Sequence, residues 1–215
     1  MQSKGIQVHS GAYVDNEKQL TCIPAIDIDG ILWTVQYIAE DGTKRFAKDS
    51  RKEGCFHVLG GIDKLADASV IVIAEGYATA ATIKEATELP AVVSAFDSGN
   101  LKSVAKALHE IYPNIPIIIA ADDDKHLEVS QGINPGKEKA QEAASAVNGF
   151  IIIPTFAPNE QSFNPKKFSD FNDLANHSIL GFEGVTRQLK PKIEKIDKRY
   201  NRPRLSRSSN VIHIA

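Results

Sequence analysis

The sequence predicts an α/β protein whose parallel sheet carries helices on both faces, preceded by a small β-rich α+β subdomain. One observation is the alternation of short apolar runs with helical patterns from Val70 onward, because repeated strand-helix-strand units form parallel sheets with right-handed crossovers. A second is the alternating texture of residues 20–60, interrupted by Asp-Gly pairs that favour hairpins. The strands expected in the parallel sheet are 70–74, 91–95, 116–121 and 150–153.

Composition is that of a globular protein, with 42% hydrophobic and 24% charged residues in a chain of 215. No run approaches the roughly 20 apolar residues of a membrane span, and the first residues have no signal-peptide core, so we expect a cytoplasmic protein. A net charge of -2 gives no general attraction to nucleic acid, which must then be bound by local basic patches. Neither the two cysteines nor the six histidines have the spacing of a zinc site.

The N-terminal subdomain is predicted to span residues 1–66. Residues 1–20 lack periodicity and are expected to be irregular or weakly helical. Three strands of an antiparallel meander follow, and one more short strand is expected within 54–61. Trp33 and Phe46 are interpreted as core residues of this subdomain. The meander strands are 21–28, 31–38 and 43–47.

Five cations near the end of the meander form what we call the basic strip. One interpretation is a solvated edge that protects a sheet margin. The other is a phosphate-contacting surface beside an active site. The basic strip comprises Lys44, Arg45, Lys48, Arg51 and Lys52.

Helices are expected to fill the intervals between the strands of the second domain, residues 67–180. Ser98-Gly99-Asn100 is expected to cap one of them, and Asn134 followed by Pro135 another. After a loop over 154–167, Ser169 or Asp170 is expected to cap a short helix. Residues 181–215 are predicted to form a helix to about residue 196 and a basic, disordered tail or docking arm. The helices of the second domain are 77–89, 100–112 and 134–149.

Acidic residues follow two strands of the predicted sheet. Glu75 ends the first strand and Asp122-Asp123-Asp124 ends the third. In the strand order 2-1-3-4 these strands are neighbours, and ligands bind at such carboxyl ends. Because alternate residues of a strand share a direction, Asp122 and Asp124 are expected to point together and Asp123 away.

Crowded carboxylates raise one another's pKa, and a divalent cation removes that cost. Oxygen ligands without nearby His or Cys select Mg²⁺ or Mn²⁺. We therefore expect Asp122 and Asp124 to bind metal, with Asp123 behind them or purely structural. Glu75 is expected to bind a second ion or to act as general acid/base. The alternative is that these acids only cap helices and solvate turns.

Three further residues have two interpretations each. Asp170 and Asp173 either complete the metal site or cap a helix. Lys137, next to Gly136 at a helix start, either binds phosphate or belongs to a plain capped helix. The order of the motifs argues against a phosphoaspartate hydrolase, whose Asp-x-Asp follows the first strand, and against a response-regulator receiver.

The pairing of Glu75-Gly76 with Asp122-x-Asp124 resembles the Toprim domain of bacterial-type primases, topoisomerases and some nucleases. Residues 75–80 and the Phe-Asn-Asp-Leu of 171–174 are similar, more narrowly, to primases of conjugative plasmids and some phages. This resemblance covers about residues 20–180. It implies a Toprim-like, Rossmann-like sheet and Mg²⁺-dependent phosphoryl transfer, with metal on the two aspartates and Glu75 as acid/base or ligand.

The resulting hypothesis is a DNA primase core that joins nucleoside triphosphates into RNA primers on a single-stranded DNA template. A metal-dependent Toprim nuclease and a non-catalytic nucleic-acid- or nucleotide-binding module are the alternatives. These 215 residues contain neither the zinc module that commonly precedes bacterial primase cores nor a helicase domain. We therefore expect a fragment of a larger protein, or a domain that acts with a helicase or other domains.

Overall fold

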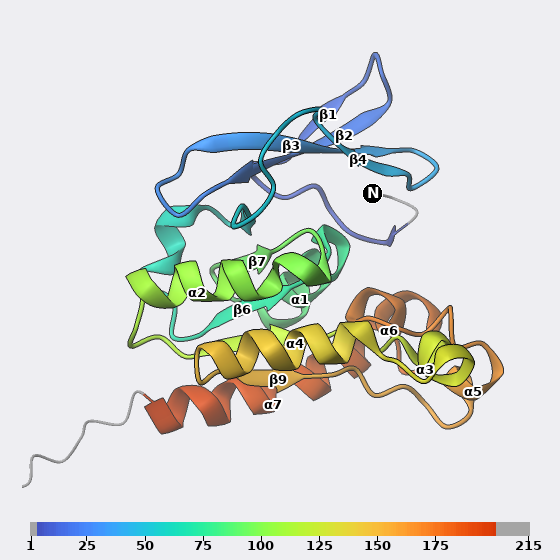
Figure 1. Ribbon diagram of the computed structural model, residues 1–215. Helices are drawn as coiled ribbons and strands as arrows, with labels where there is room; N and C mark the ends of the chain where they lie inside the picture. The colour runs from blue at the N-terminus through green and yellow to red at the C-terminus, as the bar shows by residue number, and fades with distance from the viewer. Residues whose placement is uncertain (1–3, 201–215) are drawn as a thin grey trace, which may run out of the picture.

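The computed structural model describes residues 4–200 and contains two β-sheets (Figure 1). The first is a four-stranded antiparallel sheet with the order β1-β2-β3-β4, which confirms the predicted meander. Its first strand lies where the sequence predicted irregular chain, and that prediction was wrong because three mostly exposed residues carry no hydrophobic pattern. The strands are β1 (Tyr13–Asp15), β2 (Leu20–Ile26), β3 (Leu32–Ala39) and β4 (Lys44–Phe46).

The second sheet has five strands in the order β5-β7-β6-β8-β9. Strands β6 to β9 run parallel and have the predicted 2-1-3-4 order. Strand β5, expected before the domain boundary near residue 66, pairs antiparallel with β7 and is buried throughout. The strands are β5 (His57–Leu59), β6 (Ile71–Ala74), β7 (Val92–Ser94), β8 (Ile117–Ala120) and β9 (Phe150–Ile152).

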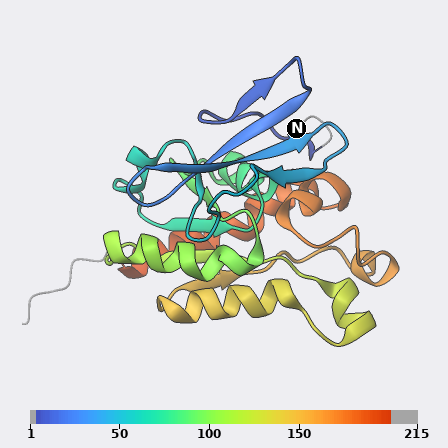
Figure 2. The ribbon, with the colours of Figure 1, turned by 45° about the horizontal axis from the view of Figure 1, so that its top comes forward.

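Helices cover both faces of the five-stranded sheet, as predicted. Alternation along β6 directs Val72 and Ala74 into one apolar cluster and Ile71 and Ile73 into the other. The first cluster includes side chains of α1 (Tyr77–Thr87), α6 (Phe171–His177) and α7 (Gly181–Tyr200). The second includes those of α2 (Leu101–Ile111) and α4 (Pro135–Ala146), which lie side by side in both ribbon views (Figures 1 and 2).

Two short helices were not predicted. They are α3 (Lys125–Gln131) and α5 (Glu160–Phe163), and neither buries a residue, so the sequence shows no apolar stripe there. Helix α4 ends before the expected Gly149, and α7 continues past residue 196 to Tyr200 with the exposed Pro191 inside it. The tail was predicted to begin at Lys198, but Lys198 and Arg199 belong to the last turn of α7; the rest of it, with Arg202, Arg204 and Arg207, lies outside the described residues. Within residues 4–200, no helix is long and apolar enough to cross a membrane.

The four-stranded sheet packs on the β5 edge of the larger one, above it in Figure 1. Ile26 forms an isolated bridge with Phe56, and Ile23 and Ala25 belong to the first apolar cluster. Asn100 fastens this junction, since its side chain donates to the carbonyls of Cys55 (2.8 Å) and Ala95 (2.9 Å) and accepts from the N–H of Gly54 (2.8 Å). Asn100 is the N-cap residue of α2, as predicted for Ser98-Gly99-Asn100, but its side chain makes no capping hydrogen bond with the described residues.

We expect Asn100→Ala to lower the free energy of unfolding by about 2–3 kcal/mol, because it leaves three backbone groups without their partner. Chemical denaturation measures the change. Asn16→Ala, in an exposed turn, is the matched control and should have little effect. Equal stability of the two variants would contradict the role given to Asn100.

Candidate active site

The carboxyl ends of β6 and β8 bring the predicted acidic residues to one edge of the sheet. Ala74 and Ala120 are register partners on these neighbouring parallel strands, so Glu75 and Asp122 follow them at the same edge. Burial and the charges of Asp124 and Asp97 together raise the pKa of Glu75 to about 7, although the charge of Lys44 opposes them. The carboxylates are therefore close enough to act on one another.

Asp122 is the most deeply placed of these groups. Burial raises its pKa well above the usual range, and the charges of Asp170, Glu75 and Asp124 add to the effect. Its Oδ1 atom is buried and has no hydrogen-bond partner among the residues that the structure describes. A carboxylate in this condition is stabilised by a positive charge, which the protein groups around it do not supply.

Asp123 faces other partners, as the alternation predicts. Its Oδ1 accepts from Lys137 Nζ (2.7 Å) and Asn134 Nδ2 (2.9 Å), and its Oδ2 from Gln161 Nε2 (3.1 Å). Burial alone would raise the pKa of this carboxyl, but these bonds bring it below its usual value. Asp123 thus connects the loop of residues 122–124 to the start of α4 and to α5.

The start of α4 also holds Asp124. The N–H of Gly136 donates to Asp124 Oδ2 (2.8 Å), and the Asn134 side chain accepts from the N–H groups of Asp124 (3.1 Å) and Lys137 (3.2 Å). A Cβ atom on Gly136 would lie 2.5 Å from the carbonyl oxygen of Asp122, so only glycine allows this approach. These contacts confirm Asn134 as the cap of α4 and engage the N–H groups that were a candidate phosphate site.

Asp170 caps α6, Asp173 lies in its first turn and accepts from Ser169, and the charges of both act on Asp122. Asp170 accepts from the N–H of Asp173 (2.7 Å) and from Thr79 Oγ1 (2.9 Å). Burial and the charge of Asp173 raise the pKa of Asp170, and both carboxylates in turn raise the pKa of Asp122. The predicted capping by Asp170 is confirmed.

Members of the basic strip have different roles. Lys44, on β4, lies beside the site, since a Cβ on Gly76 would be 3.9 Å from its Nζ. The Lys52 Nζ is 2.6 Å from Asp97 Oδ2. Arg51 instead stacks over the ring of Trp33 at 4.6 Å. Arg45 lies 5.9 Å from the ring centroid of Tyr37, and Lys48 is exposed.

The two aromatic residues assigned to the core differ. Phe46 packs edge-on against Phe96 with centroids 5.4 Å apart, in agreement with the prediction. Trp33 is 42% exposed, so its assignment to the core was wrong. Its indole N–H donates to Asp27 and its ring supports Arg51, which explains a large aromatic residue at the surface.

Comparison with known proteins adds to this geometry. The model of the Toprim domain family matches residues 70–178, about half of the chain. The chain belongs to the Toprim domain family. The matched region carries Glu75 and all three consecutive aspartates. We call the edge of the five-stranded sheet that carries these acidic residues the Toprim edge.

Two curated relatives are named DNA primase TraC, both from Escherichia coli. They are 46% and 45% identical over 91% and 92% of this chain. The chain spans 24% and 17% of their lengths. Among solved structures, the primase fragment of the bacteriophage T7 primase-helicase protein aligns with a TM-score of 0.51 at 17% identity, covering 77% of this chain and 69% of that one. That similarity supports the fold.

Asp97 is a member of the Toprim edge that sequence reasoning missed. It follows β7, caps the short 3₁₀ helix Ser98–Asn100 by accepting from the N–H of Asn100 (3.1 Å), and raises the pKa of Glu75. The same argument that selected Glu75 selects Asp97, because it comes two residues after the predicted strand 91–95. The segment that follows, Ser98-Gly99-Asn100, was interpreted only as a helix cap, and Asp97 was therefore not considered as a site residue.

The side chains of the Toprim edge are chemically suited to a hard cation, because their candidate ligand atoms are carboxylate oxygens. One of these, Asp122 Oδ1, is buried and has no partner among the described residues. Within residues 4–200, no three acidic, His or Cys side chains converge into a complete metal site. Mg²⁺ is usually held by one or two carboxylates, with waters and substrate phosphates completing its shell. The residues present are compatible with that kind of binding.

The raised pKa of Glu75 predicts a pH-dependent effect of Glu75→Gln on stability. A folded-state pKa of about 7, above the ordinary 4.5, means that the native protein loses stability as the pH rises through this interval. The neutral glutamine removes this loss, so the variant should gain thermal stability relative to wild type between pH 5 and pH 8. Melting temperatures in EDTA measure it. Exposed Glu40→Gln is the control, and a difference that does not change with pH would contradict the assignment.

Proposed function

We propose that this chain is the catalytic core of a DNA primase, which makes RNA primers on single-stranded DNA with Mg²⁺ or Mn²⁺. The crowding of Glu75, Asp122 and Asp124 at the Toprim edge is the observation that carries the proposal. The names of the TraC relatives support it, as does the family match. Because the chain spans a quarter or less of those relatives, a helicase or further domains are proposed as partners.

The proposed chemistry is nucleotidyl transfer. The 3′-hydroxyl of the primer attacks the α-phosphorus of a nucleoside triphosphate, an O–P bond forms, and pyrophosphate leaves. A divalent ion held by Asp122 and Asp124 would neutralise charge on the phosphates. Glu75, with a pKa of about 7, is suited to take the proton of the attacking hydroxyl near neutral pH.

The remaining acids have supporting roles in this proposal. Asp123 positions the loop through its bonds to Lys137, Asn134 and Gln161 rather than binding metal directly. The negative charges of Asp170 and Asp173 act on Asp122 and thereby favour a cation bound to it. A phosphate contact by Lys137 would have to compete with its ion pair to Asp123.

Template and nucleotide phosphates are proposed to contact the basic strip. Lys44 lies beside Gly76, and Arg45 and Lys48 are exposed on the same strand and the turn after it. A cation beside Glu75 is needed because phosphates must approach an edge that is otherwise negative. Arg51, engaged with Trp33 and 3.9 Å from Asp27, belongs to the structural part of the strip.

Asp122→Asn and Asp124→Asn should each reduce primer synthesis at least about 100-fold, because they remove a charge that binds the ion. The assay incubates the chain with a single-stranded template, labelled ribonucleotides and Mg²⁺, and the products are short RNA oligomers. Asp63→Asn, which is exposed and distant from the site, is the matched control. Shortened template would instead indicate a nuclease, and no product despite retained DNA binding would favour a binding module.

Lys44→Ala should weaken binding to single-stranded DNA and reduce the slope of log affinity against log salt by about 0.7, the loss of one phosphate contact. Arg51→Ala should instead lower the melting temperature and leave the slope nearly unchanged, because it removes the support of Trp33. Fluorescence anisotropy over a salt series measures the first effect and thermal denaturation the second. Identical salt slopes for wild type and Lys44→Ala would count against a phosphate contact there.

A further inference from the structure

Strand β9 is an outer strand of the five-stranded sheet, far along the sheet from β5 and the four-stranded sheet. The carbonyl of Ile152 accepts from the N–H of Ala121 (2.9 Å), so residue 152 directs its backbone towards β8. Backbone direction alternates along a parallel strand. The N–H and C=O groups of Ile151 therefore point to the open side, where another strand can pair with them.

Just beyond β9, at Thr155, a side chain of α7 takes the place of a neighbouring strand. The Gln188 side chain of α7 accepts from the N–H of Thr155 (2.9 Å) and donates to its carbonyl (2.7 Å). A side-chain amide thus reproduces the paired bonds of a neighbouring strand. The protein thus closes the backbone at Thr155 by itself, whereas within residues 4–200 β9 pairs only with β8 and the outward-facing groups of Ile151 have no partner strand.

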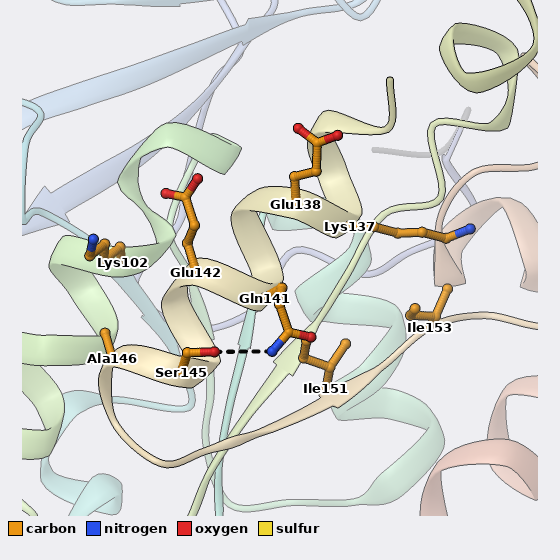
Figure 3. Close-up of a pocket in the computed structure, with 9 residues that line it drawn as sticks. All are labelled: Lys102, Lys137, Glu138, Gln141, Glu142, Ser145, Ala146, Ile151 and Ile153. Atoms are coloured by element: carbon orange, nitrogen blue, oxygen red, sulfur yellow. Dashed lines mark hydrogen bonds between the residues drawn. The ribbon is translucent and has the colours of Figure 1, made fainter. Parts of the chain in front are cut away.

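Hollows lie on both sides of β9. Figure 3 shows the one between β9 and α4, where Ile151 lies beside Gln141 and Ile153 lies nearer to Lys137. The other lies between β9 and α7 and is lined by Phe150, Ile152 and Ile196 among others. An added strand directs alternate side chains to opposite faces, so each hollow would receive every second side chain.

The two hollows differ in charge. The cations Lys192, Lys195 and Arg199 surround the apolar floor on the α7 side, and no acidic residue is among the described residues that line it. The α4 side balances two lysines with two glutamates. Charge complementarity thus favours acidic side chains on the α7 side and small apolar ones on the α4 side.

We propose that the β9 edge binds an extended, acidic polypeptide segment by strand addition. The segment would pair with the backbone of Ile151, place alternate acidic side chains against Lys192, Lys195 and Arg199, and place small apolar side chains against Ile151 and Ile153. A polypeptide fits better than nucleic acid, because the edge presents both N–H and C=O groups and an apolar hollow. This binding is independent of primer synthesis, since β9 carries none of the acidic side chains of the Toprim edge.

The test uses the full chain and a fluorescein-labelled peptide of sequence Glu-Val-Glu-Val-Glu-Val, with Lys-Val-Lys-Val-Lys-Val as its charge-reversed control. We expect saturable binding of the acidic peptide by fluorescence anisotropy and NMR amide shifts at Ile151 and Ile153. Lys195→Glu should weaken it at least 10-fold, and Lys106→Glu, exposed on α2, should not. Ile151→Pro removes the outward N–H and should weaken binding equally. Lys195→Glu should leave primer synthesis unchanged, which separates this inference from the proposed function.

Three results would overturn the proposal. One is equal binding of the acidic and basic peptides. Another is displacement of the acidic peptide by an oligothymidylate with shifts at β9, which would make the edge a nucleic-acid surface. The third is a concentration-dependent dimer in sedimentation analysis that covers β9. If Ile151→Pro does not fold, as judged by circular dichroism, the Lys195→Glu result alone decides.

Discussion

The crowding of carboxylates at the carboxyl ends of β6 and β8 is the constraint on which the rest of the structure depends. The parallel register that places Ala74 beside Ala120 forces the next residues together, whatever their charge. Burial and mutual repulsion raise the pKa of Glu75 and Asp122, so the native state holds these groups in an unfavourable condition. Carboxylates with pKa values perturbed by burial and by like charges are typical of functional sites, and this supports the function proposed for this edge.

The N-terminal sheet supplies positive charge that partly offsets the repulsion between these carboxylates. Lys44 opposes the repulsion around Glu75, and the Lys52–Asp97 ion pair and the Asn100 amide hold the following segment against β7. Strand β5 belongs to the Toprim sheet, so the chain enters that sheet before the first βαβ unit begins. The position of the cations beside the acids therefore follows from backbone pairing as well as from charge. The domain boundary near residue 66 stays a prediction.

Sequence reasoning succeeded where a physical pattern extends over several residues. The apolar strands and their acidic ends predicted the sheet order and the meeting of Glu75 with Asp122, because parallel sheets allow few arrangements. It failed where a contact depends on the other sheet or on a few residues. The place of Trp33 in the meander predicted a core residue, although Arg51 and Asp27 hold it at the surface. The short α3 has no buried side chain and so leaves no periodic pattern.

Three consecutive aspartates serve two purposes because their side chains have different partners. Asp122 and Asp124 lie within electrostatic range of Glu75, while Asp123 is bonded to Lys137 on α4 and Gln161 on α5. Lys137 is thus engaged in holding the loop in place. Under the proposed function, a phosphate that approaches the Toprim edge would meet Lys44 of the antiparallel sheet, whose charge already opposes the repulsion around Glu75. Two lysines thus have separate tasks: Lys137 is engaged with Asp123, and Lys44 of the antiparallel sheet offsets the repulsion around Glu75.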